Sequence, residues 1–134
     1  MNENMETQKE MILEHVRDIC LALPEALEHI DGFGHTTFQV HGKSFVRLSE
    51  RTGLSFKSNP ETQEWLLQKE QFFKTPYIGR HGWVSILNPR DEDWGELTAL
   101  IQEAYLRVAP KRLVKEWITR IRLIKKNGFS IAPK

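Results

Sequence analysis

Hydrophobic residues recur with two different periods along this chain, and each period predicts one kind of element. Between residues 10 and 24 they return every three or four positions, which is the spacing of one face of a helix. Thr7 and Glu10 have the spacing of a capping box, so this first helix is predicted to begin at Thr7. Pro24 ends the pattern.

Residues 36–57 alternate instead between hydrophobic and polar side chains, which predicts strands with one buried face. Short turns at residues 42–43 and 51–53 divide this stretch into an antiparallel meander, to which residues 28–30 add an edge strand. The alternation predicts an inward-facing set: Phe38, Val40, Val46, Leu48, Leu54 and Phe56. It places a second set on the opposite face: Gln39, His41, Lys43, Phe45, Arg47, Ser55 and Lys57.

A short helix and two further strands follow the meander. Asn59 is placed to cap a helix over residues 61–69, with Pro60 in its first turn, where the missing N–H costs nothing. Extended segments are predicted at 72–77 and 83–87, joined by a turn bounded by glycines.

Two more helices complete the chain. One follows Pro89, with Asp91 or Asp93 as its cap. Pro110 starts the other, which is predicted to span residues 110–127 and to end at Gly128. The whole pattern predicts an α+β fold over a single domain, 1–134, with an antiparallel sheet, helices packed on it and an additional basic C-terminal helix.

The composition is that of an ordinary globular protein, with 40% hydrophobic and 28% charged residues. The single cysteine, Cys20, cannot form an intramolecular disulfide, which favours a reducing compartment. The sequence shows neither the basic-then-apolar pattern of a signal peptide nor an apolar run approaching the ~18 residues of a membrane span. We therefore expect a cytoplasmic protein with no membrane partner.

The net charge of +1 conceals a strong asymmetry. Residues 1–106 hold 10 Lys and Arg against 17 Asp and Glu, a net charge of −7. Residues 107–134 hold 9 Lys and Arg against Glu116 alone, a net charge of +8. Such a basic segment is typical of an arm that meets nucleic acid, a membrane surface or an acidic partner, and equally of a helix that folds back onto its own acidic domain.

Several short motifs occur together: Leu23-Pro24-Glu25, Phe38-Gln39-Val40, Gly42-Lys43-Ser44-Phe45, Pro76-Tyr77-Ile78-Gly79, Gly82-Trp83-Val84, and a closing helix with Leu97, Ile101, Tyr105 and Val108-Ala109. In this combination the chain resembles the MmcQ/YjbR proteins over about residues 8–112. The resemblance implies a compact fold related to frataxin (CyaY-like) and a DNA-binding role through a double-wing arrangement. The helix at 110–127 extends beyond it.

Candidate binding residues come first from the alternation in the meander. If the outer face of the sheet is free, Lys43, Arg47 and Lys57 can neutralise phosphates and Phe45 can stack on an exposed base. The alternatives are a solvated sheet face that carries one stray aromatic, or a face covered by the C-terminal helix. In the glycine-bounded turn, Arg80 is the candidate and Trp83, like Phe38, is expected in the core.

The C-terminal helix supplies a second group of candidates. Lys111, Lys115 and Arg122 fall in one stripe, and a basic amphipathic helix can bind phosphates, an anionic membrane or a partner groove. The opposite side of the helix is apolar and includes Trp117. That side needs cover, either from the same domain or from a second copy in a homodimer.

Catalytic and metal chemistry find little support in the sequence. Cys20 lies on the apolar face of the first helix, where desolvation opposes the thiolate. The carboxylates Glu6, Glu10, Glu14 and Asp18 follow one another along that helix, but Lys9 and Arg17 interrupt them, so we interpret them as a solvated face. No phosphate-binding loop, dinucleotide fingerprint or nucleophile motif is present. We expect no catalytic residues, no cofactor and no metal site.

The sequence thus predicts a non-enzymatic protein that binds nucleic acid, DNA in preference to RNA, through phosphate contacts of weak sequence preference. The alternative is a protein-interaction or small-ligand module whose basic helix only completes the fold.

Overall fold

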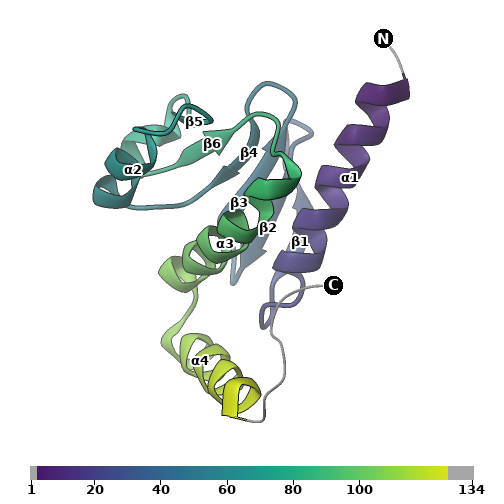
Figure 1. Ribbon diagram of the computed structural model, residues 1–134. Helices are drawn as coiled ribbons and strands as arrows, with labels where there is room; N and C mark the ends of the chain where they lie inside the picture. The colour runs from purple at the N-terminus through teal and green to yellow at the C-terminus, as the bar shows by residue number, and fades with distance from the viewer. Residues whose placement is uncertain (1–2, 127–134) are drawn as a thin grey trace.

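The computed structural model describes the backbone of residues 3–126 and the side chains of residues 7–126. One antiparallel sheet of six strands in the order β1-β2-β3-β4-β6-β5 forms its centre, with helices packed against it (Figure 1). The strands are β1 (Leu27–Ile30), β2 (Thr36–Val40), β3 (Lys43–Ser49), β4 (Gly53–Phe56), β5 (Phe72–Lys74) and β6 (Val84–Ile86). The helices are α1 (Glu3–Cys20), α2 (Pro60–Leu66), α3 (Trp94–Val108) and α4 (Lys111–Lys126), with 3-10 turns η1 (Ile78–His81) and η2 (Asp91–Asp93).

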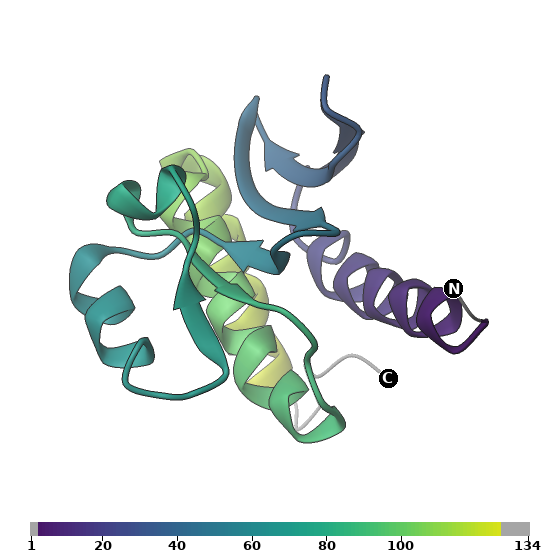
Figure 2. The same cartoon turned by 90° about the horizontal axis from the view of Figure 1, so that it is seen from above.

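This arrangement confirms the predicted α+β class, the meander and the edge strand before it. The six strands pair antiparallel throughout. Viewed from above, α1 and α3 lie on the same side of the curved sheet, and α2 lies beyond the β5 edge (Figure 2). Among the described residues, no helix has the length and apolar character needed to cross a bilayer.

The helix starts follow the predictions in part. Asn59 caps α2, since its side-chain oxygen accepts a hydrogen bond from the Thr62 backbone N–H at 2.8 Å. The predicted start of α1 at Thr7 is wrong, because the helix already begins at Glu3. Residues 3–6 contain neither Pro nor Gly, so nothing in their backbone prevents the helix from extending past the capping signal. The predicted end at Asn127 and Gly128 lies outside the described residues.

The core lies between the sheet and the helices α1 and α3. Phe38, Val46 and Phe56 are fully buried on the helix side of neighbouring strands, as the alternation predicts. Trp83 is also buried and Cys20 is buried on α1. The buried hydroxyl of Tyr105 on α3 donates a hydrogen bond to the Pro24 carbonyl at 2.8 Å, which fixes α3 to the turn that follows α1.

Phe45 departs from the predicted alternation. Phe38 pairs with Val46, and the next residue, Gln39, pairs with Ser44, so Phe45 is the extra residue of a β-bulge in β3. A bulge turns two successive side chains toward the same side of the sheet. Phe45 is therefore fully buried beside Val46, with its ring packed edge-on against Tyr105 at a centroid distance of 5.5 Å. The prediction that Phe45 is available to stack on a base is wrong.

Helix α4 packs on its own domain. Leu113 and Trp117 are buried in the core cluster. Arg112 forms an ion pair with Glu25 at 3.2 Å, and the Arg120 guanidinium donates to the Ala22 carbonyl at 3.3 Å. Both partners belong to the segment between α1 and β1, so the part of the apolar side that carries Leu113 and Trp117 is covered from within the same chain.

Candidate functional site

The outer face of the sheet, the side opposite α1 and α3, carries a row of hydroxyl groups. Ser55 on β4 and Ser85 on β6 pair across the strands, with 2.6 Å between their hydroxyl oxygens. The Thr75 hydroxyl lies 2.8 Å from that of Ser85. All three side chains are buried, although they lie on the face of the sheet opposite the hydrophobic core. The centre of this face is thus a satisfied polar layer.

Arg47 lies on the same face, next to Ser55 in the β3–β4 register. Its side chain is half-buried, and its Nε is buried without a hydrogen-bond partner in the described part of the chain. A buried donor without an acceptor is unfavourable, and an anion is the partner that a guanidinium favours most. The predicted outward position of Arg47 is confirmed, but only part of the side chain is open to solvent.

The turn between β5 and β6, residues 76–82, projects at the end of these strands, and we call it the wing. Tyr77 has φ 65° and ψ −63°, and the Ile78 N–H donates to the Pro76 carbonyl at 2.7 Å, which together define a γ-turn. Gly82 has φ 95°, and a Cβ at this position would lie 2.6 Å from the Ser58 carbonyl oxygen. Only glycine satisfies both conditions at residue 82.

A buried glutamine holds the wing in place. The side-chain amide of Gln63 on α2 donates to the Gly79 carbonyl at 2.7 Å and to the Trp83 carbonyl at 3.0 Å. These two carbonyls lie within and directly after the wing, so one side chain fixes both of its arms. As predicted, Arg80 is exposed at the tip, whereas Trp83 is buried at the base.

The wing and the sheet bring several of the predicted cations together. The Lys57 amino group lies 3.4 Å from the His81 carbonyl oxygen, so Lys57 adjoins the turn that carries Arg80. The Lys57 backbone N–H donates to the Phe45 carbonyl at 3.0 Å, which connects this point to the start of β3, where Lys43 is exposed. Lys57 and Arg80 thus share one corner, with Arg47 on the adjoining strand. Lys43 precedes the bulge and pairs with the inward-facing Val40, so its predicted place on the outer face is wrong: its side chain is exposed on the helix side of the sheet.

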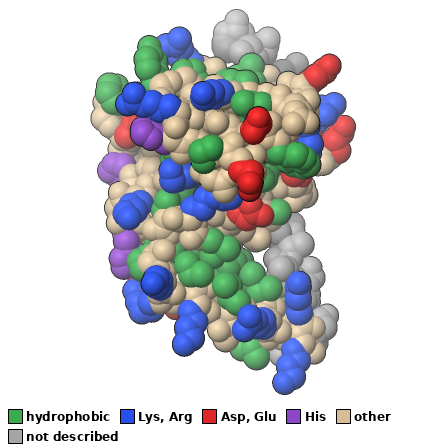
Figure 3. All heavy atoms as spheres, turned by 90° about the vertical axis from the view of Figure 1, so that its left-hand side faces the viewer, with side chains coloured by type: hydrophobic (Ala, Val, Ile, Leu, Met, Phe, Trp, Pro, Cys, Tyr) green, Lys and Arg blue, Asp and Glu red, His purple; other side chains and the backbone are tan. Residues whose placement is uncertain are grey.

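Helix α4 carries the other predicted cations on a separate surface. Lys111, Lys115 and Arg122 are exposed and line a groove of about 460 Å³ between α4 and the end of α3. The apolar floor of the groove includes Val114 and Ile118. In Figure 3 this apolar patch is visible near the bottom of the molecule, bordered by Lys and Arg. We call it the α4 groove.

The predicted cations share one electrostatic property. Across the described residues, none of the seven forms an ion pair with an acidic side chain: Lys43, Arg47, Lys57, Arg80, Lys111, Lys115 and Arg122. Other cations do, including Arg17 with Glu28 at 2.7 Å and Lys69 with Glu96 at 2.6 Å. Arg51, Lys74, Lys125 and Lys126 likewise lack such an ion pair in the described part of the chain. We call the seven predicted residues the unpaired cations.

Titratable groups outside this set serve the structure. Burial raises the pKa of the Cys20 thiol well above its ordinary value, so the reactive thiolate is disfavoured. Burial also raises the pKa of Tyr105 to about 12. A hydrogen bond from His41, followed by one from Arg112, lowers the pKa of Glu25. Within the described residues, His, Cys, Asp and Glu side chains nowhere form a group of three placed to hold a metal ion.

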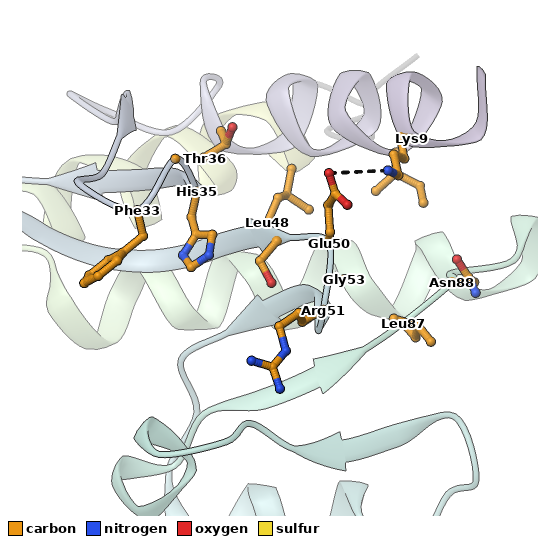
Figure 4. Close-up of a pocket in the computed structure, with 13 residues that line it drawn as sticks. Lys9, Phe33, His35, Thr36, Leu48, Glu50, Arg51, Gly53, Leu87 and Asn88 are labelled. Carbon is orange, nitrogen blue, oxygen red and sulfur yellow. Dashed lines mark ion pairs between the residues drawn. The ribbon is translucent and has the colours of Figure 1, made fainter. Parts of the chain in front are cut away.

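A further hollow lies away from the predicted site residues. It has a volume of about 610 Å³ and lies between the first half of α1, the β1–β2 loop and the β3–β4 turn. Phe33 and His35 project into view from the loop and Arg51 from the turn, while Lys9 pairs with Glu50 at its rim (Figure 4). Its lining also includes Leu87 and Asn88 after β6, so it combines apolar, basic and acidic groups from four separate segments, which no sequence pattern connects.

Tyr77 is the site residue that sequence reasoning missed. Its side chain is 93% exposed, and it directly precedes the 3-10 turn η1 that contains Arg80 and His81. The only available signal was its place between proline and glycine in the most specific family motif.

Comparisons with known proteins agree with the resemblance found in the sequence. The family model YjbR matches residues 21–107. The crystal structure of the Deinococcus radiodurans protein DR2400, described as a DUF419 domain, superposes with a TM-score of 0.59 at 24% sequence identity, covering 78% of this chain and 86% of that one. At this identity the likeness concerns the fold alone. None of the curated proteins matches the sequence.

Proposed function

The chain belongs to the YjbR family, and from that premise we propose that it is a non-enzymatic DNA-binding protein that contacts phosphates through its unpaired cations. The observation that carries the proposal is their lack of acidic partners among the described residues. A lysine or arginine that no carboxylate neutralises attracts phosphate and releases the counterions condensed around it. The double-wing role that the family resemblance implies points the same way.

The geometry favours contacts with the backbone rather than with base edges. Arg80 lies at the tip of the wing, Lys57 adjoins it, and Arg47 lies on the outer face of β3. Among the described residues, α1 and α3 lie on the opposite side of the sheet and are not placed to enter a major groove beside these cations, and Phe45 is buried. Phosphate contacts position a protein on nucleic acid without reading sequence, so we propose weak sequence preference. A cytoplasmic setting belongs to the same proposal, since the single cysteine needs no oxidising compartment.

The salt dependence of DNA binding tests this proposal. If the three cations of the outer face and the wing, Arg47, Lys57 and Arg80, each contact one phosphate, the logarithm of the affinity for duplex DNA falls with the logarithm of salt concentration with a slope of roughly −2.7. Replacing these three residues with alanine flattens the slope by about 2.7. Fluorescence anisotropy with a labelled duplex at several salt concentrations measures both values.

The matched control removes the same charge from paired positions. Lys9, Lys69 and Arg107 each pair with a carboxylate, so their replacement by alanine changes the net charge equally but removes no unpaired cation. We expect its slope to stay near that of the wild type. A separate triple variant at Lys111, Lys115 and Arg122 tests whether the α4 cations also contact phosphate. Absence of binding at low salt and tens of micromolar protein contradicts the DNA proposal, since this concentration falls within the usual non-specific range of about 1–100 μM.

The α4 groove supports a second candidate, a protein-interaction role without nucleic acid. Its apolar floor and rim of Lys111, Lys115 and Arg122 complement an acidic amphipathic helix, with apolar residues on one face and carboxylates beside them. A synthetic peptide with leucines at helical spacing and flanking glutamates is a suitable probe. Under this candidate, reversal of Lys111 and Lys115 to glutamate abolishes peptide binding, whereas the same change at Lys125 and Lys126, outside the groove lining, has a smaller effect.

A further inference from the structure

Tyr77 combines two properties that rarely occur together. Its ring is 93% exposed, so it contributes almost nothing to the core. Its backbone has φ 65° and ψ −63°, a conformation that is unfavourable for a bulky side chain. Strain at an exposed aromatic residue has no benefit for folding, because glycine at the same position would relieve it. Such strain is typical of positions where a side chain is held ready for a ligand.

The surroundings hold Tyr77 in this orientation. The Gly79 N–H donates to the Thr75 carbonyl at 2.8 Å, closing the turn around Tyr77, and Gln63 fixes the Gly79 carbonyl from the other side. A Cβ at residue 79 would lie 2.5 Å from Cγ of Lys74, so the turn also packs closely on β5. The backbone that carries the exposed ring is thus fixed by hydrogen bonds and close packing.

Two cations belong to the same turn as Tyr77 or reach it. Arg80 is exposed three residues after Tyr77, and Lys57 reaches the carbonyl of His81. An exposed aromatic ring among unpaired cations is the combination by which proteins bind single-stranded nucleic acid: the cations follow the backbone and the ring stacks on a base. In a duplex the faces of the bases are already stacked on one another, so the ring gains a partner only when a base is unpaired.

We propose that Tyr77 is a stacking platform for one unpaired base, so that the wing binds single-stranded nucleic acid in preference to duplex. This inference rests on the proposed phosphate contacts of the same wing. The Tyr77 hydroxyl plays no part in it, because stacking uses the face of the ring.

Three variants at one position test the proposal. Tyr77→Ala is expected to weaken binding of a labelled 12-nucleotide oligothymidylate by roughly 5- to 150-fold, the effect of losing one stacked base, and binding of a 12-base-pair duplex by less than about twofold. Tyr77→Phe retains single-strand affinity within about twofold, since it keeps the ring. Tyr77→Gly loses the same affinity as alanine but raises the thermal midpoint of unfolding, because it relieves the strained φ. That combination excludes unfolding as the cause of the loss.

The outcomes separate this inference from the proposal beneath it. If the wild type binds neither oligonucleotide, the proposed function fails and the inference fails with it. If the wild type binds with the expected salt slope but Tyr77→Ala leaves single-strand affinity unchanged, only the stacking role is overturned. Equal losses on single strand and duplex overturn the preference for unpaired bases. Loss in Tyr77→Phe assigns the contact to the hydroxyl and overturns stacking.

Discussion

The wing and helix α4 carry the same kind of charge, but the molecule holds them in opposite ways. The wing is fixed by buried polar contacts, with both of its arms hydrogen-bonded to Gln63. Helix α4 is fixed by apolar burial of Leu113 and Trp117, and its polar contacts, such as Arg112 with Glu25, are exposed. The cations of the wing are therefore presented from a rigid frame, and those of α4 from an element with few attachments.

The two elements also differ in which groups would become exposed if each detached from the rest of the domain. If the wing moved away, the Gly79 and Trp83 carbonyls would lose the hydrogen bonds that Gln63 donates, and the buried Trp83 side chain would be exposed. Releasing α4 uncovers a small apolar surface after the extended residue Ala109, which already separates it from α3. Rigid presentation suits a geometric contact such as stacking. Attachment by two buried side chains and a few exposed polar contacts suits a helix that adapts to, or exchanges for, a partner. The comparison makes three predictions in order of expected effect.

The largest effect concerns the anchor of α4. Replacing Trp117 with alanine removes a buried ring and is expected to cost about 3–5 kcal/mol of the free energy that holds α4 in place. Because α4 has few attachments, we expect its amides to lose protection in hydrogen exchange while those of β3 and β4 keep theirs. Leu123→Ala is the control, since Leu123 is 54% exposed on the same helix. Equal loss of protection in the sheet would show that α4 is an integral part of the core.

The sequence predicts this fold where its periods are regular. Phe38 and Val46 are buried because the alternation of β2 and β3 is regular up to that pair. The prediction fails at Phe45, because the bulge adds one residue to β3 without any signal in the composition. Phe45 and the residues of β3 before it therefore lie on the face opposite to the one that regular alternation predicts. That shift, not a wrong strand assignment, removed Phe45 from the candidate site.

The candidate site was predictable only in its charges. Lys57 and Arg80 are identifiable from their residue types and their positions beside turns. Their proximity depends on the tertiary contact between the segment after β4 and the wing, which the sequence does not show. The strain at Tyr77 is a property of backbone angles that tyrosine seldom adopts, so no propensity signals it. Docking of α4 was also undecidable, since an amphipathic basic helix buries its apolar face equally well on its own domain or on a partner.

The intermediate effect concerns the support of the wing. Gln63→Leu leaves the Gly79 and Trp83 carbonyls without their donor, and we expect a loss of about 1–3 kcal/mol in the free energy of unfolding. Single-strand affinity should fall as well, because the wing no longer holds Tyr77 and Arg80 in one geometry. Chemical denaturation and anisotropy measure the two effects. Gln68→Leu is the control, an identical change at an exposed residue beyond α2. If affinity is unchanged in a destabilised Gln63→Leu protein, rigidity of the wing is not required for binding.

The smallest effect is a pH dependence of the docking of α4 on the domain, in which the wing takes no part. Glu25 accepts a hydrogen bond from His41 at 2.8 Å and one from Arg112 at 3.2 Å, and these contacts lower its pKa from the ordinary 4.5. A carboxylate with a lowered folded-state pKa stabilises the folded protein above its unfolded pKa, and this contribution disappears as pH falls through the folded value. Docking of α4 should therefore weaken modestly below about pH 4.5, and only modestly, because water screens these exposed groups.

The Trp117 indole N–H resonance, followed between pH 6 and pH 3, reports this change from inside the α4 contact. Glu25→Gln removes the carboxylate and should abolish the dependence. Glu28→Gln is the matched control, because Glu28 also has a lowered pKa but pairs with Arg17 on α1, away from α4. Glu116, which lies on α4 and pairs with Arg120 of the same helix, is unchanged in both variants. If the indole resonance shifts equally in Glu25→Gln and the wild type, the polar contacts of α4 contribute nothing to its docking, and apolar burial alone holds the helix.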